Sequence, residues 1–276
     1  MPEGHTLRRL ALDLDAAFAG DRVAVSSPQG RFAAEAAQLD GAVLVGAESA
    51  GKHLFVAFEG ERLVHVHLGL IGRFDVADGP APAPQGAVRL RLVGPRAHAD
   101  LRGATRCDLV TPERRDAVVA SLGADPLRAD ADPDRAWATI SRSRRSIGEL
   151  LMDQAVVAGV GNVYRAEVLF RQRVDPFRPG TSLRRAQWQA IWDDLVALMP
   201  EGVVANRIDT VRPEHAPEAM GREPRADDHG GEVYVYRRAG QPCLLCGTTV
   251  RTEPMASRNL FWCPRCQRRW RPRPVR

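Results

Sequence analysis

The chain has 276 residues, of which 44% are hydrophobic and 26% are charged, as in an ordinary globular protein. This length permits one large domain or two to three smaller ones. No apolar run approaches the roughly 18 residues of a membrane span, and the N-terminus lacks a basic-then-apolar signal pattern. The protein is therefore expected in the cytoplasm, where its five cysteines favour metal binding over disulfides.

Positive charge is unevenly distributed along the chain. The net charge is +5, and the segment from Arg237 to the end holds ten arginines and one acid, Glu253. A basic tail of this kind commonly faces a polyanion, most often phosphate. The alternative is a tail that only increases solubility.

The first 125 residues or so are predicted to form a β-rich domain. Residues 3–18 carry apolar side chains at helical spacing and predict an opening amphipathic helix. Period-two patterns then predict strands at residues 23–25, 42–45, 54–58, 63–68 and 88–93. Glu59-Gly60 suggests a hairpin turn between two of them, and residues 79–86 form an exposed loop.

From about residue 132 the pattern becomes helical. Helices are predicted at residues 147–157, 163–172 and 183–199, and the first two are joined by the short turn Ala158-Gly-Val-Gly-Asn162. Residues 203–232 are rich in proline, glycine and charge, and they predict a loop or linker.

Four cysteines close the chain in two CxxC pairs. Cys243 and Cys246 are separated by sixteen residues from Cys263 and Cys266. Each pair spans one edge of a tetrahedron, so four thiolates predict one closed, structural zinc site. The segment between the pairs would form a hairpin with Arg258 near its tip, where the guanidinium either contacts phosphate or is simply exposed.

The N-terminus offers a candidate nucleophile. The small residue after Met1 permits removal of the methionine, which leaves the secondary amine of Pro2 as the N-terminus. An α-amino group has a pKa of about 8, so a useful fraction is unprotonated at neutral pH. Attack on a sugar C1′ gives an iminium ion, and Glu3 supplies a carboxyl group for acid–base work. Proline is common at this position, so the pattern is weak alone.

Lys52 is the only lysine in the chain, against 38 arginines. Arginine does not release its proton at neutral pH, whereas the pKa of a buried lysine falls readily. Lys52 directly precedes a predicted strand and is a candidate for proton transfer or phosphate contact, although its retention by chance is the alternative.

Other polar and aromatic residues are interpreted as structural. The histidines His53, His65 and His67 lie in strand patterns and are expected to pack or hydrogen-bond rather than bind metal. Cys107 is interpreted as a buried apolar residue. Trp188 and Trp192 are interpreted as core residues of one helix. The arginines at positions 142, 144 and 145 either contact phosphate or form a solvated face.

Together these motifs resemble the formamidopyrimidine-DNA glycosylase and endonuclease VIII family from end to end. The resemblance rests on Met1-Pro-Glu-Gly, Gly51-Lys-His, Leu151-Met-Asp-Gln, Ala158-Gly-Val-Gly-Asn-Val-Tyr and the four-cysteine finger. It is greatest for the actinobacterial endonuclease VIII branch, because of Met1-Pro-Glu-Gly-His-Thr and Ser257-Arg-Asn-Leu-Phe-Trp-Cys.

The resemblance implies a multi-domain α+β fold. It predicts an N-terminal β-sandwich with flanking helices at residues 1–130, which carries the catalytic groups. A helix–two-turn–helix DNA-binding domain with a trailing loop follows at residues 131–232, and a zinc-finger β-hairpin closes the chain at residues 233–276.

The resemblance also assigns roles. Pro2 would form the Schiff base, Glu3 would help open the sugar ring, and Lys52 would assist β-elimination. Arg258 would hold phosphate during δ-elimination, and Asn162 would contact phosphate at a helix N-terminus.

Enzymes that flip a nucleotide out of the duplex must fill the emptied stack. The resemblance gives this role to Leu70, as an apolar wedge, and to Arg102.

The leading hypothesis is a monomeric glycosylase and AP lyase that removes oxidised pyrimidines from damaged double-stranded DNA by β,δ-elimination. It would associate with the nucleoid by binding DNA, and no membrane partner is expected. A related alternative is an oxidised-purine enzyme. An alternative of another class is a DNA-binding protein that performs no chemistry.

Overall fold

The computed structural model describes residues 2–226 and 231–272, and the chain divides into two compact units, Met1–Ser121 and Leu122–Arg276. The predicted trimming of Met1, the arginines Arg273 and Arg276 of the basic tail, and residues 227–230 of the predicted loop lie outside the described residues. Within the described ranges, no helix combines the length and apolar character that crossing a membrane requires.

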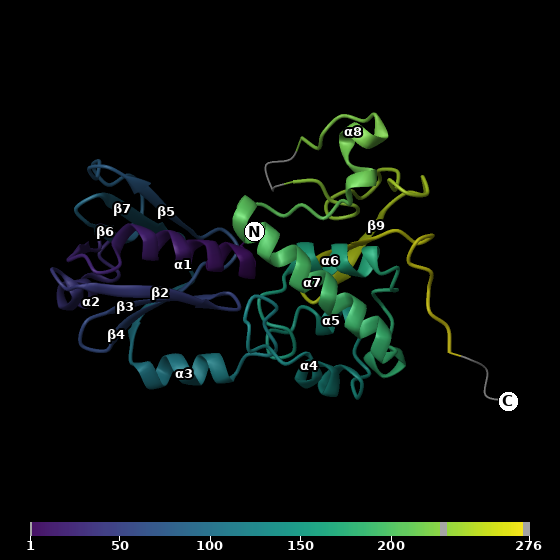
Figure 1. Ribbon diagram of the computed structural model, residues 1–276, viewed down its shortest axis with the longest axis horizontal. Helices are drawn as coiled ribbons and strands as arrows, with labels where there is room; N and C mark the ends of the chain where they lie inside the picture. Colours follow the sequence, from purple (N-terminus) through teal and green to yellow (C-terminus); the bar gives the residue numbers. More distant parts are fainter. Residues whose placement is uncertain (1, 227–230, 273–276) are drawn as a thin grey trace. The chain divides into compact units, whose positions relative to one another are not determined.

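Two four-stranded antiparallel sheets form the first unit as a sandwich (Figure 1). One sheet has the order β1 (Ala24–Ser26), β6 (Val88–Val93), β7 (Ala97–Arg102), β5 (Arg73–Asp78). The other has the order β2 (Leu44–Ala50), β3 (His53–Phe58), β4 (Arg62–His67), β8 (Arg106–Val110). Three helices complete the unit: α1 (Gly4–Phe18), α2 (Ala33–Leu39) and α3 (Pro112–Ala120).

The predicted opening helix is confirmed, and its apolar side chains build the core of this unit. Leu7, Leu14 and Phe18 are at most 1% exposed, and α1 packs against strands of both sheets. Strand β3 contributes Leu54 and Val56 from its inner face to the same core. Because the helix inserts its apolar face between two sheets, the start of α1 is held firmly in place.

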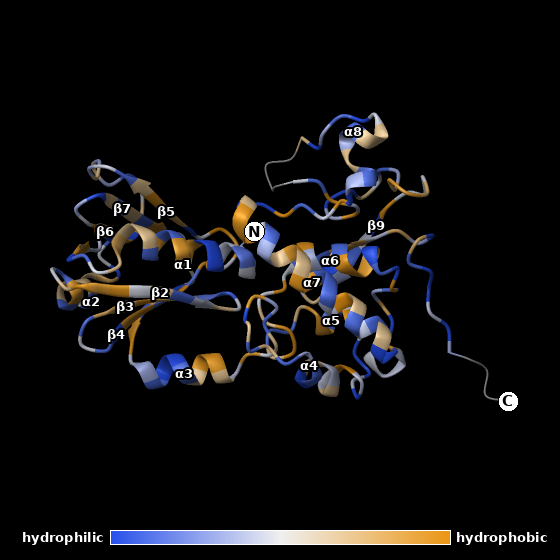
Figure 2. Ribbon diagram, in the orientation of Figure 1, coloured by the Kyte–Doolittle hydropathy of each residue, from blue (hydrophilic) through white to orange (hydrophobic). Residues whose placement is uncertain are grey.

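Sequence analysis missed three strands of the first unit, β5, β7 and β8, and two helices, α2 and α3. Strands β5 and β7 pair over their full length, yet polar or charged residues occupy half of the positions in Arg73-Phe-Asp-Val-Ala-Asp and Ala97-His-Ala-Asp-Leu-Arg. Charges pair across these two strands, as in the contact of Arg102 with Asp75 at 2.9 Å. Helix α3 buries none of its side chains, and it is hydrophilic at its start and hydrophobic at its end (Figure 2).

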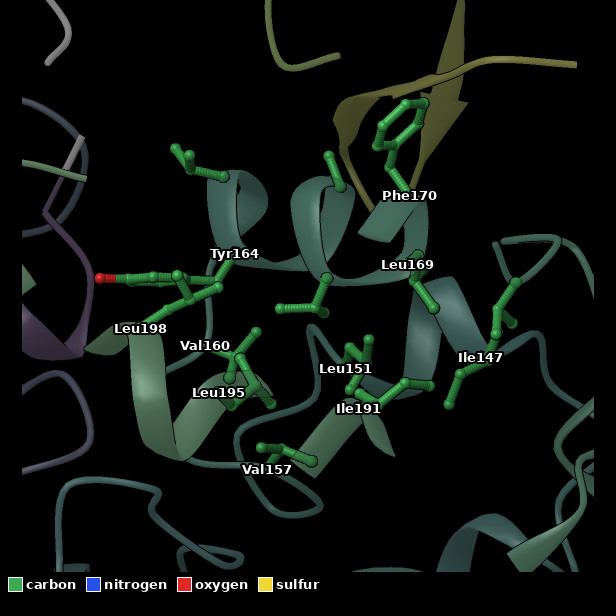
Figure 3. Close-up of a cluster of buried hydrophobic side chains, with 14 of the residues drawn as sticks. Ile147, Leu151, Val157, Val160, Tyr164, Leu169, Phe170, Ile191, Leu195 and Leu198 are labelled. Carbon is green, nitrogen blue, oxygen red and sulfur yellow. The ribbon is translucent and has the colours of Figure 1, made fainter. Parts of the chain in front are cut away.

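The second unit is mainly helical and ends in a two-stranded hairpin. Its elements are α4 (Pro133–Ile140), α5 (Ile147–Leu150), α6 (Asn162–Arg171), η1 (Gly180–Ser182), α7 (Arg185–Ala205), η2 (Pro213–His215), α8 (Pro217–Met220), β9 (Arg251–Met255) and β10 (Arg258–Trp262). Figure 3 shows the core that α6 and α7 share with the segments before them, including Leu151, Tyr164 and Ile191. Trp188 and Trp192 also belong to this core, as the sequence predicted.

The helix predicted at residues 147–157 is wrong beyond its first turn, because α5 ends at Leu150. The side chain of Asp153 accepts a hydrogen bond from the backbone of Ala155 at 3.1 Å. The side-chain amide of Gln154 donates to the carbonyl of Val160 and accepts from the N–H of Gly159, both at 3.0 Å. These local bonds offer the backbone an alternative to a continuous helix.

The prediction of a loop from residue 203 is wrong at its start, because α7 continues to Ala205 and ends at Asn206 in the left-handed conformation, with φ 52°. The loop also contains the short helices η2 and α8. Glu167 anchors its far end. The Glu167 carboxylate is fully buried and accepts hydrogen bonds from the backbone of Tyr234, Val235 and Tyr236 and from Thr210.

Replacing Glu167 with glutamine is expected to destabilise the second unit by about 2 to 4 kcal/mol. The substitution turns one acceptor oxygen into an NH₂ group that faces backbone N–H donors with no water to satisfy them. Denaturant unfolding measures the change. Glu201→Gln on the exposed side of α7 is the matched control, and an equal, small effect of both variants would contradict this role of Glu167.

Candidate active site and DNA-binding elements

The predicted nucleophile lies at the entrance to α1. Pro2 is partly exposed and directly precedes Glu3, which caps the helix and is fully buried. The Glu3 N–H donates to Thr6 Oγ1 at 3.4 Å, and the helix N-terminus favours a negative charge on the neighbouring carboxylate. The fold therefore fixes Glu3 beside an accessible proline.

Lys52 lies in the tight turn between β2 and β3, directly before β3, as the sequence predicted. Gly51 precedes it with φ 56°, the left-handed conformation that a two-residue hairpin turn requires. Burial is the main cause that lowers the pKa of His53 to about 3, with contributions from the charges of neighbours that include Lys52. The lysine ammonium therefore acts electrostatically on the histidines of this sheet.

The rings of three histidines cluster where β3 begins and β4 ends. His53 Nδ1 lies 2.8 Å from His65 Nε2, and the ring of His65 stacks on Phe55 with centroids 4.6 Å apart. The predicted packing and hydrogen bonding are present at His53 and His65. The backbone N–H of Gly69 donates to His67 Nδ1 at 3.2 Å, so the proton of the neutral His67 ring is on Nε2.

Sequence analysis did not recognise that His67 offers a donor near Lys52. Burial comes first among the causes that lower the pKa of His67, and the charge of Lys52 follows it. The His67 ring lies 5.1 Å from the ring of His53, the residue that follows Lys52, and a neutral Nε2–H in such a positively charged region suits an anionic ligand. The sequence signal was the alternation His65-Val-His67, which places both rings on one face of β4.

The first unit is expected to lose roughly 2 to 4 kcal/mol of stability as the pH falls from about 6.5 to 4. Burial is the largest cause that lowers the pKa of His5 and of His65 to about 4, so the folded state resists protons that the unfolded chain binds. The stability is therefore complete above pH 6.5 and is lost on acidification. Thermal unfolding against pH measures this loss.

The variant His65→Phe retains the ring stacked on Phe55 and removes one titrating group from the cluster. It is expected to reduce the pH dependence of unfolding. An unchanged dependence would show that the histidines do not cause the loss of stability.

The turn between β4 and β5 exposes two apolar side chains. Leu70 is 49% exposed and Ile71 is 85% exposed. Gly69 has φ 69°, and a Cβ there would lie 2.4 Å from Thr105 Cγ2, so only glycine fits this turn. Sequence analysis proposed Leu70 alone. Its neighbour was missed, although two apolar residues between glycines are a sign of an exposed apolar tip.

Arg102 is held by carboxylates of its own sheet. Its guanidinium contacts Asp75 at 2.9 Å and Asp100 at 2.8 Å, and it donates to the carbonyl of Gln85 at 3.0 Å. Arg102 would have to leave these partners to enter a DNA duplex.

The four cysteines of the second unit lie together. Their Sγ atoms are all within 4.8 Å of one another, with Cys246 and Cys263 at 3.4 Å and Cys243 and Cys266 at 3.9 Å. Sulfur atoms that surround a tetrahedral zinc ion are about 3.8 Å apart, so the donor set fits zinc. Cys107 is buried at 2% exposure in the first unit and behaves as the predicted apolar residue.

The finger hairpin presents Arg258 directly after its turn. Ala256 and Ser257 have φ 52° and 59°, which is the two-residue turn typical of hairpins. Arg258 begins β10, is half-buried, and donates to the carbonyl of Ser257 at 2.7 Å. The sequence placed this arginine near the tip, which the structure confirms.

Asn162 connects the hairpin to α6. Its side-chain amide donates to the carbonyl of Asn259 at 2.9 Å and its oxygen accepts from Arg165. Arg165 is fully buried and also donates to the carbonyl of Met255 at 3.2 Å. Asn162 is only 3% exposed, and both polar groups of its side chain are bonded within the protein. Sequence analysis missed Arg165, whose signal was a charge within an otherwise apolar helix.

Comparison with known families covers most of the chain. The formamidopyrimidine-DNA glycosylase N-terminal domain matches residues 1–107, and the corresponding H2TH domain matches residues 122–212. The zinc finger found in FPG and IleRS matches residues 240–269.

Relatives match over nearly their whole length. Endonuclease 8 1 of Mycobacterium tuberculosis is 52% identical over 97% of this chain and 100% of its own. Probable endonuclease 8 2 of Streptomyces coelicolor is 33% identical, with 99% and 96% covered. Formamidopyrimidine-DNA glycosylase of Parasynechococcus marenigrum is 31% identical, with 97% and 99% covered.

Solved structures share the fold. The Lactococcus lactis Fpg in complex with an abasic site containing DNA gives a TM-score of 0.78 at 18% identity, covering 97% of this chain and 100% of that one.

The chain belongs to the formamidopyrimidine-DNA glycosylase and endonuclease VIII family. It is a DNA glycosylase with AP lyase activity, a bifunctional enzyme of base-excision repair with one structural zinc.

Proposed function

We propose that this enzyme removes oxidised pyrimidines from duplex DNA through a Schiff base on Pro2 and then cuts the strand by β,δ-elimination. The observation that carries the choice of substrate is the 52% identity, across nearly both full lengths, to a relative named endonuclease 8 1. The enzyme acts in the cytoplasm as a monomer.

Chemistry begins once Met1 is removed. The Pro2 nitrogen attacks C1′ of the damaged nucleotide, the N-glycosidic bond breaks, and the base leaves with its electron pair and a proton. Glu3 gives a proton to O4′ so that the sugar ring opens, which leaves an iminium ion between Pro2 and C1′. The support for this step is an accessible Pro2 followed by a buried carboxyl group at the same helix start.

The iminium ion accepts electrons in the two eliminations. Loss of a C2′ proton breaks the C3′–O bond, and a subsequent deprotonation at C4′ breaks the C5′–O bond. Lys52 assists the first elimination, and Arg258 holds phosphate during the second. His67 Nε2–H and the backbone at the start of α6, next to Asn162, are further phosphate donors.

Zinc holds the finger that carries Arg258, with Cys243, Cys246, Cys263 and Cys266 as its ligands.

The apolar tip of the β4–β5 turn fills the stack that the flipped nucleotide leaves. Leu70 and Ile71 are exposed on this turn, which suits insertion between bases. Arg102 also fills this emptied stack, once its ion pairs with Asp75 and Asp100 have broken.

The proposed substrate class predicts at least about tenfold faster cutting of a thymine glycol duplex than of a matched 8-oxoguanine duplex. Single-turnover rates on the two duplexes, which share every other base pair, measure the ratio. Preference for 8-oxoguanine would instead support an oxidised-purine enzyme, as the names of the relatives near 31% identity suggest.

A further inference from the structure

The outer face of the second sheet carries a groove, and none of the residues that line it has a role in the chemistry above. It has a volume of about 600 Å³ and is bounded by β2, β3, the turn before β4, and the start of α3. All of its lining residues belong to the first unit, between Asp15 and Asp116.

Two small residues form the floor of this groove. Gly46 pairs directly with Ala57 across β2 and β3, and the carboxylate of Asp15 lies at the Gly46 end of this floor, where its Oδ1 would be 3.0 Å from a Cβ on Gly46. The register shift between Leu44 and Gly46 turns Val45 outward, where it is 60% exposed. Further apolar lining comes from Phe55, Leu63 and Pro112. Helix α3 covers this face incompletely because it buries none of its side chains.

Negative charge surrounds the apolar floor. Five carboxylates and two guanidinium groups line the groove: Asp15, Glu48, Glu59, Glu61, Asp116, Arg62 and Arg115. Both guanidinium groups are engaged, since Arg115 pairs with Glu48 and Asp116 and Arg62 donates to backbone carbonyls. The groove therefore has an excess of three negative charges in a chain whose net charge is +5.

This combination excludes DNA as the occupant, because carboxylates repel phosphate and an apolar floor gives it nothing to bind. It fits a chain segment that places an apolar side chain over Ala57, Phe55 and Leu63 and positive charges on the acidic rim. We propose that this acidic groove docks a basic segment of a partner protein, in which an aliphatic or aromatic residue lies between arginines or lysines.

The test uses the full chain and a fluorescent hexapeptide with a Leu-Phe pair between two pairs of arginines. One comparison peptide has glutamates in place of the arginines, and a second has serines in place of Leu-Phe. Anisotropy titration at low salt is expected to show binding of the first peptide at least about tenfold tighter than of either comparison peptide. Equal binding of the three, or no binding of the first, would overturn the proposal.

Two independent variants locate the binding. The pair Glu61→Lys with Asp116→Lys reverses the rim charge, and Ala57→Leu fills the floor. Each is expected to weaken peptide binding about tenfold while cutting of damaged DNA continues. The pair Asp78→Lys with Glu113→Lys makes the same change of charge outside the groove and is expected to leave peptide binding unchanged. Equal loss in the control pair would assign the binding to net charge and contradict the proposal.

A second copy of the chain is the competing occupant. Sedimentation of the full chain without peptide is expected to give a single species at all concentrations. A dimer that Glu61→Lys with Asp116→Lys dissociates would make the groove a self-association surface and overturn the proposal.

Discussion

Replacing Pro2 with leucine is expected to lower base excision and strand cutting by at least about a thousandfold. A large second residue prevents removal of Met1, so the free amine moves one residue, about 3.8 Å, from its required place. Proximity of nucleophile and C1′ is then lost, and proximity supplies much of the rate. Borohydride trapping on a damaged duplex, with single-turnover rates alongside, measures the loss.

Two further substitutions serve as a comparison and a control for Pro2→Leu. Pro2→Ala leaves a primary α-amine at the same place and is expected to retain more trapping than Pro2→Leu. Pro80→Leu, in the exposed loop before β6, makes the same change of side chain far from the N-terminus and is expected to retain full activity. Normal trapping by Pro2→Leu would mean that another group forms the Schiff base.

Removal of zinc is the second change with a large expected effect. Cys263→Ser opens the four-thiolate site, and a finger with little apolar core of its own then unfolds. The hairpin no longer presents Arg258, and affinity for a duplex with an abasic site is expected to fall roughly 10- to 100-fold. Metal analysis establishes the zinc loss and anisotropy measures the affinity.

The matched control is Cys107→Ser, which alters a buried thiol of the first unit outside the finger. It is expected to retain zinc and DNA affinity, with some loss of stability. Unchanged affinity of Cys263→Ser after verified loss of zinc would contradict a role for the finger in DNA binding.

Elements with strong local patterns were predicted well from the sequence. Helix α1 and strand β6 have regular apolar spacing, and the cysteine pairs have the separation that a zinc site requires. Lys52 stood out because it is the only lysine in the chain, and the structure places it in a turn where glycine supplies the needed backbone conformation.

Features that depend on particular side-chain hydrogen bonds, whether local or long-range, could not be predicted. The end of α5 depends on side chains that bond the following turn, as Gln154 does. The buried role of Glu167 depends on backbone groups at Tyr234–Tyr236, almost seventy positions later. A glutamate in a helix is usually solvated, so nothing local distinguishes this one.

The same limit applies to the exposed apolar turn and the groove. The two apolar residues between glycines were a weak sign of an exposed tip, and the exposure of Ile71 followed only from the geometry of its turn, because apolar residues next to glycine also occur in many buried strands. The acidic groove arises from the pairing of Gly46 with Ala57 and from the incomplete cover of α3, and neither is visible in the linear sequence.

The account depends above all on a covalent bond between the Pro2 nitrogen and deoxyribose. Mass spectrometry of the borohydride-trapped complex after proteolysis tests this directly, because it identifies the modified residue and the state of the N-terminus together. The account predicts an N-terminal peptide that lacks Met1 and carries the reduced sugar on Pro2. A sugar on Lys52, or a trapped chain that still begins with Met1, would contradict it.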